Sequence, residues 1–94
     1  MNNQEQQLQL KANDEDVKGR YSNLVMIGHS QEEFVLDFCT VFPPQGILVS
    51  RILTSPGHVK RLIKALKENL DKYEDKYGKV DTASEPETKI GFTK

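Results

Sequence analysis

The sequence predicts a small α+β domain in which a three-stranded antiparallel meander is followed by one long C-terminal helix. Two segments rich in β-branched and aromatic residues are joined by a short polar stretch, and a third follows a break that contains Pro and Gly. Apolar residues then recur at helical spacing up to a glycine. The 94 residues of the chain suffice for one small domain only, which excludes a multi-domain enzyme.

The three strands are predicted at residues 21–29, 33–42 and 47–54. The polar residues 30–32 between the first two indicate a hairpin connection. Residues 43–46, Pro-Pro-Gln-Gly, interrupt the chain before the third strand, because proline cannot donate to a β-ladder and glycine relieves a turn. Short connections of this kind predict an antiparallel meander.

The long helix is predicted at residues 56–77. Ser55 can cap its first turn, Pro56 suits the first helical position, and Gly78 follows its end. Apolar residues spaced 4, 3, 4, 3, 4 form a heptad seam, which consists of Val59, Ile63, Leu66, Leu70, Tyr73 and Tyr77. At about 33 Å the helix is longer than an eight-residue strand of about 27 Å, so its far end is expected to overhang the sheet.

Composition divides the chain into three parts. Residues 1–19 are mostly Asn, Gln, Asp, Glu and Lys, and residues 79–94 are again polar. Both segments hold too few apolar residues to offset the entropy lost on ordering, so both are predicted to be disordered tails. The folded domain is predicted at residues 20–78, which is near the lower limit for independent folding.

Both faces of the predicted sheet are apolar, because large apolar residues occupy both parities of all three strands. One helix can cover only one face, and the other would remain as a large exposed apolar patch. We therefore expect a homodimer, or a heteromer, in which a partner covers the second face. The expected dimer interface comprises Leu66, Leu70, Tyr73 and Tyr77.

Charge and cysteine content give no sign of a membrane or a disulfide framework. Thirteen basic and fourteen acidic residues give a net charge of -1. The N-terminal segment lacks an apolar run long enough for a signal peptide or a membrane helix. A single cysteine, Cys39, excludes an intrachain disulfide and suits a reducing compartment. We expect a cytoplasmic protein with no membrane partner.

The sequence contains no motif that predicts catalysis, a metal site or a cofactor. The two histidines, His29 and His58, have no Cys or carboxylate at ligand spacing. Cys39 is expected to be a small core residue, because a nucleophile would need a nearby base and an exposed, electropositive setting. No phosphate-binding loop and no nucleophile elbow occurs. The expectation is therefore a protein that is not an enzyme.

Positive charge is concentrated in one stretch. Residues 51–67 contain five basic residues and no acidic one. The basic residues are Arg51 and the four of the first half of the helix, called here the basic half-helix, namely Lys60, Arg61, Lys64 and Lys67. Two interpretations remain open. The residues form either a solvated helix face or a docking surface for an acidic protein or a nucleic-acid backbone.

Arg51 interrupts the apolar alternation of the third strand, and Asp37 does the same in the second. The two residues are expected to pair across the strands. Alternatively, Arg51 reaches a binding partner.

The segment from Tyr21 to Gly78 resembles the domain of unknown function 3467 family of short prokaryotic proteins. The most specific parts of the resemblance are the start YSN, the dipeptide DF that ends the hairpin, the segment SRI and the helix start SP. The resemblance implies a dimeric β-sheet-plus-helix domain without known activity, and supplies no catalytic residues. Some members are encoded close to RNA polymerase large-subunit genes, which suggests a transcription-linked partner.

Two functions are therefore predicted as alternatives. The first is a non-catalytic dimeric protein-interaction module that docks on a larger machine, with RNA polymerase subunits as the candidate, through Arg51 and the basic half-helix. The second is a weak, sequence-tolerant nucleic-acid binder that uses the same residues. The aromatic residues do not favour the second function, because Phe34, Phe38 and Phe42 share one strand parity and are expected in the core.

Overall fold

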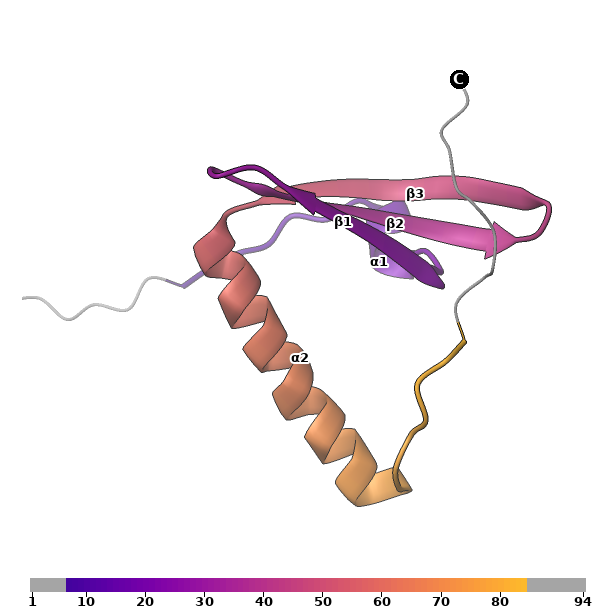
Figure 1. Cartoon of the computed structure of the whole chain (residues 1–94). Coiled ribbons are helices and arrows are strands. Elements are labelled where there is room, and N and C mark those ends of the chain that lie inside the picture. Colours follow the sequence, from indigo (N-terminus) through magenta and orange to yellow (C-terminus); the bar gives the residue numbers. More distant parts are fainter. Residues whose placement is uncertain (1–6, 85–94) are drawn as a thin grey trace, which may run out of the picture.

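The computed structural model describes residues 7–84. In chain order the elements are α1 (Asp14–Lys18), β1 (Leu24–His29), β2 (Phe34–Phe42), β3 (Gln45–Thr54) and α2 (Pro56–Tyr77), as Figure 1 shows. The strands form one antiparallel sheet in the order β1-β2-β3, so β2 is the central strand. The predicted α+β fold, a meander followed by one long helix, is confirmed.

The turn between β2 and β3 is shorter than predicted. β3 begins at Gln45, because Gln45 and Gly46 already pair with Phe42 and Val41 of β2. Only Pro43 and Pro44 remain as the turn, and the peptide bond between them is cis. β3 is therefore two residues longer at its start than the sequence indicates.

The chain before β1 attaches to β2 through side chains, in addition to one backbone bond from the Asn23 N–H to the Cys39 carbonyl at 3.0 Å. The Asn23 amide Nδ2 donates to the Val41 carbonyl at 2.8 Å, and its Oδ1 accepts from the Val41 backbone N–H at 2.8 Å. The Ser22 hydroxyl donates to the Cys39 carbonyl at 2.9 Å. Asn23 thus satisfies both backbone groups of Val41 in the way that a neighbouring strand residue would. This arrangement explains why regular pairing starts only at Leu24.

The register of the strands defines two faces, since residues directly opposite each other share a face. The first, called the Phe face, carries Val25, Ile27, Phe34, Leu36, Phe38, Phe42, Ile47 and Ile52. The second, called the Cys face, carries Leu24, Met26, Val35, Cys39, Val41, Leu48 and Leu53, together with Asp37 and Arg51. A β-bulge between Phe38 and Cys39 accommodates Val49 as the extra residue of β3. Both faces are apolar, as predicted.

Burial within the described chain is confined to the central strand. The buried residues are Leu36, Asp37, Cys39 and Val41, and none of them is completely enclosed. All four lie on β2, because only β2 has a neighbouring strand on both sides. The expectation that Cys39 is a core residue is confirmed.

α2 begins and ends where the sequence predicts. The Ser55 hydroxyl accepts the His58 backbone N–H at 3.1 Å, and the Gly78 N–H donates to the Glu74 carbonyl at 2.8 Å. Gly78 has φ +94°, a left-handed conformation that glycine adopts without steric cost. The signals at both ends are local, so the sequence alone identifies them.

The prediction that the long helix covers one face of its own sheet is wrong. α2 leaves the end of β3 and diverges from the sheet (Figure 1). No residue of α2 is buried, and among residues 7–84 the extended packing contacts between elements are those of β1 with β2 and of β2 with β3. The physical reason is the connection, because Ser55 alone separates Thr54 from Pro56 and one residue cannot reverse the chain onto the sheet.

A short helix that the sequence did not predict, α1, lies within residues 1–19. None of its residues is buried, and its contacts include ion pairs between Lys18 and Glu15 at 3.9 Å and between Arg20 and Asp16 at 3.6 Å. Residues 79–84 form neither helix nor strand. The remaining parts of the two predicted tails, residues 1–6 and 85–94, lie outside the described residues.

Candidate interaction surfaces

The basic half-helix lies on the first half of α2 and is exposed at all four residues. The Arg61 guanidinium donates to His58 Nδ1 at 3.1 Å, and Lys67 Nζ lies 3.3 Å from an Asp71 carboxylate oxygen, one turn further along. The first turn of α2 contains no acidic residue. The four side chains therefore share one helix, whereas Arg51, the fifth predicted docking residue, lies on β3.

Arg51 and Asp37 form a two-pronged ion pair across β2 and β3. Arg51 Nε donates to Asp37 Oδ1 at 2.7 Å, and Nη2 donates to Oδ2 at 2.9 Å. The hydrogen bonds from the guanidinium, reinforced by its charge, hold the pKa of the Asp37 carboxyl below its ordinary value of 3.8, although burial acts in the opposite direction. The same hydrogen bonds raise the pKa of Arg51. The predicted cross-strand pair is confirmed.

This geometry restricts what Arg51 can offer to a partner. Asp37 is 6% exposed, while the Arg51 side chain is about half exposed. One edge of the guanidinium is already engaged with both carboxylate oxygens. A contact between Arg51 and a partner stays a prediction, and it would have to use the outer edge of a side chain that Asp37 holds in place.

The predicted dimer residues line one exposed stripe on α2. Leu66 is 62% exposed, Leu70 is 50% exposed and Tyr77 is 64% exposed. The rings of Tyr73 and Tyr77 lie 4.9 Å apart between centroids. Exposure of this size along several turns is unusual for the apolar side of an amphipathic helix. The stripe is thus available to another surface.

Apolar exposure continues on the sheet. On the Phe face Ile27, Phe42 and Ile47 are exposed, and on the Cys face Leu48 and Leu53 are exposed. α2 covers neither face. The structure therefore presents three apolar surfaces, namely the two faces of the sheet and the stripe of α2.

In the part of the chain that the structure describes, side chains with catalytic or ligand chemistry do not gather at one place. Among residues 7–84, no three His, Cys, Asp or Glu side chains are close enough to hold a metal ion. His29 stacks on Phe34 at 5.2 Å between ring centroids, and His58 lies in the first turn of α2. The buried Cys39 thiol donates to the Asp37 carbonyl at 3.7 Å. The two histidines and the cysteine thus have separate structural neighbours.

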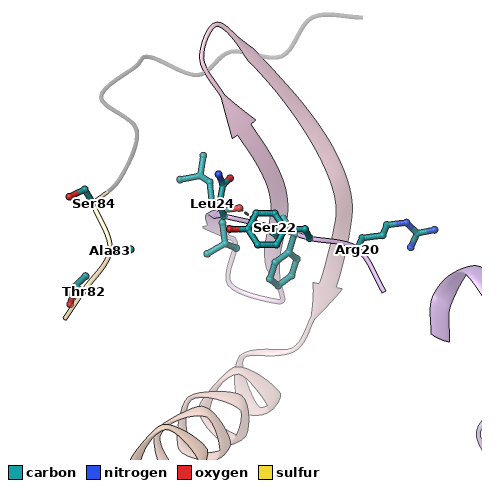
Figure 2. A pocket seen from close by; sticks show the side chains of 10 residues that line it. Arg20, Ser22, Leu24, Thr82, Ala83 and Ser84 are labelled. Carbon is teal, nitrogen blue, oxygen red and sulfur yellow. Dashed lines mark hydrogen bonds between the residues drawn. The ribbon is translucent and has the colours of Figure 1, made fainter. Parts of the chain in front are cut away.

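A shallow hollow lies beside the start of β1. It is formed by residues 20–25, Phe38 and residues 82–84. Figure 2 shows Thr82, Ala83 and Ser84 on one side of the hollow, across from Ser22 and Leu24. Arg20 is the one charged residue of its lining, so no pair of opposite charges converges there. Neither helix within residues 7–84 combines the length and the hydropathy needed to cross a membrane.

A family model described as "Protein of unknown function (DUF3467)" matches residues 1–82. The chain belongs to the DUF3467 family. The match confirms the resemblance found in the segment from Tyr21 to Gly78, and it extends further, over the N-terminal residues as well. No curated protein and no solved structure matches the chain.

Sequence reasoning missed the structural role of Ser22 and Asn23. Both belong to the YSN start, one of the segments that carry the DUF3467 resemblance. A signal was present, since Ser and Asn favour hydrogen bonds from side chain to backbone and stand here directly before a β-pattern. The partner strand, however, lies 17 and 18 residues further along the chain and is not visible locally.

Proposed function

We propose that this DUF3467 protein is a non-catalytic, dimeric protein-interaction module that docks on a larger cytoplasmic assembly. The observation that carries the proposal is the exposed apolar stripe of α2 beside a sheet that α2 leaves uncovered. With four buried residues, all on β2, the described chain has less core than a domain of this size needs to fold alone. Association of two copies supplies the missing burial.

The basic half-helix supports a docking role on an acidic surface. Lys60 and Lys64 repel each other one turn apart, and Lys60 and Arg61 lie near the positive N-terminal end of α2. Each placement costs a few tenths of a kcal/mol of local helix stability, at about 0.2–0.5 kcal/mol for a like-charged pair. A helix selected for stability alone would carry acidic residues there. An acidic partner surface offsets this cost.

RNA polymerase subunits are the candidate partner. The support is the gene neighbourhood that the family resemblance suggests, together with the basic character of α2. The structure contributes the surface and its charge. The proposal is tested by identifying what the protein binds in its own cells.

The test is native co-purification of a tagged chain, with nuclease treatment and mass spectrometry of the retained proteins. The docking variant is Arg61→Glu with Lys64→Glu, and the matched control is Lys72→Glu with Lys76→Glu on the second half of the same helix. RNA polymerase subunits are expected with the wild-type chain and the control but not with the docking variant. Equal recovery with both variants, or recovery of the tagged chain alone from wild-type cells, would refute the proposal.

Nucleic-acid binding is the second candidate, and it rests on the same basic residues, which a dimer doubles. A sequence-tolerant binder retards unrelated duplexes and releases them steeply as salt increases. We expect micromolar protein to cause no gel shift in about 50 mM salt. A shift that the docking variant abolishes would replace protein docking by nucleic-acid binding as the function.

A further inference from the structure

The stripe of α2, extended by Val59 and Ile63 at the start of the helix, has the spacing of a helix–helix interface. Its apolar residues recur at alternating intervals of four and three over the whole length of the helix, from Val59 through Leu66 and Leu70 to Tyr77. This interval keeps side chains on one narrow line, which suits packing against a second helix of similar length. Among the described elements, α1 has five residues and is too short to serve as that helix. A second copy of α2 has the required length and the same stripe.

The charges of α2 discriminate between the two directions in which copies can pair. The first half carries the four positive charges of the basic half-helix and no negative one. Residues 68–77 carry four acidic residues and two lysines, which gives a net charge of -2, and they comprise Glu68, Asp71, Lys72, Glu74, Asp75 and Lys76. Parallel pairing would place positive halves together, whereas antiparallel pairing places each positive half against a negative one. The helix macrodipoles also favour the antiparallel direction.

We propose that two copies of this chain pair through antiparallel α2 helices, with Leu66 of each copy opposite Leu70 of the other. This inference rests on the dimer of the proposed function and specifies its geometry. The twofold axis then passes near residue 68, and symmetry makes both halves of the interface identical. The same register places Ile63 opposite Tyr73 and Val59 opposite Tyr77, so the stripe is matched along its full length.

The register also aligns charged side chains beside the stripe. Lys60 and Glu74 each follow a stripe residue directly and therefore lie on the same flank of the helix. Across the twofold axis, Lys60 of one copy faces Glu74 of the other, twice in each dimer. Glu74 is half-buried as a residue, and its carboxylate accepts the Val80 backbone N–H at 2.9 Å.

Pairing in this way leaves two of the docking residues, Arg61 and Lys64, accessible. With about 100° of rotation per residue, Arg61 and Lys64 point roughly 140–200° away from the stripe. They face outward in the antiparallel pair, whereas Lys60 contributes to the seam. One helix thus carries a dimer face and a docking face on different sides, so the two can be tested by different substitutions.

Cysteine cross-linking tests the direction of pairing. All chains carry Cys39→Ala, and a short thiol-reactive cross-linker is applied to Ile63→Cys, to Tyr73→Cys and to an equal mixture of the two. Antiparallel pairing predicts cross-linked dimers in the mixture only, because positions 63 and 73 lie about 15 Å apart along one helix but face each other across the pair. Cross-linking of each variant with itself would indicate parallel helices and overturn the inference, and so would the absence of cross-links.

Light scattering of the wild-type chain separates this inference from the proposed function. A monomeric mass at low micromolar concentration would overturn both. A dimeric mass with the wrong cross-links, or none, would overturn the antiparallel geometry and leave a dimer of another form.

Charge reversal gives a second readout that needs no cysteine. Lys60→Glu and Glu74→Lys are each expected to raise the dimer Kd by about fivefold or more, because each places two like-charged pairs in the dimer. The double variant restores opposite charges and is expected to return Kd toward the wild-type value. If the Kd of the double variant is raised by the two single effects combined, the proposed register is overturned.

Discussion

Truncation of Leu66 measures how strongly the stripe of α2 is buried in the dimer. Leu66 is 62% exposed in one copy, so Leu66→Ala in a monomer would change the free energy of unfolding by no more than about 0.5 kcal/mol. In the proposed dimer the side chain is enclosed, and a buried Leu→Ala change costs about 2–5 kcal/mol. Two equivalent sites in each dimer give about 4–10 kcal/mol. Even the lower figure raises the dimer Kd by roughly a thousandfold.

The assay is the mass of the protein by light scattering or sedimentation over a wide range of concentrations. The wild-type chain is expected to remain a dimer in the low micromolar range, where Leu66→Ala is expected to be a monomer. Lys72→Ala, on the outer side of the same helix, is the matched control and should dissociate like the wild-type chain. If Leu66→Ala and Lys72→Ala dissociate at the same concentration, the stripe is not the interface and the argument from its exposure fails.

Three further predictions concern the stability of the fold. Asn23→Ala removes two hydrogen bonds to β2 and should lower the free energy of unfolding in urea by about 1–3 kcal/mol. Equal stability of Asn23→Ala and the wild-type chain would contradict the role of Asn23. The folded pKa of Asp37 lies below 3.8, so its pair with Arg51 contributes stability that is present above that pH and is lost as the pH falls through the folded pKa. Thermal unfolding followed on acidification should show this loss. Arg51→Met should remove that part of the pH dependence and lower stability at neutral pH. Ser55→Ala should cost about 1 kcal/mol in the same urea assay, and a change below a few tenths would show that the cap of α2 is not stabilising.

The helix and the strands follow from local signals, and this is why the sequence predicts them well. Ser55, Pro56 and Gly78 each act within one helical turn, so the ends of α2 agree with the prediction. The start of β1 does not agree, because the Asn23 side chain takes the place of backbone pairing with Val41. That substitution depends on the position of β2, which no local pattern reveals.

The candidate surfaces, too, were predictable from the sequence in part and depended on the tertiary structure in part. The sequence by itself determined the concentration of positive charge in the basic half-helix, the spacing of the stripe and the membership of the chain in a family without a known activity. It also predicted the pairing of Arg51 with Asp37, since two charges in adjacent apolar strands have few other ways to be satisfied.

Only the tertiary structure decided that α2 leaves the sheet uncovered. An amphipathic pattern shows that one side of a helix is apolar, but it does not specify what packs against that side. Here the direction of α2 follows from the single residue Ser55 between Thr54 and the helix, and from the orientation of β3 at its end. The apolar sides of the helix and the sheet are therefore both exposed within one copy, because the short connection keeps them apart.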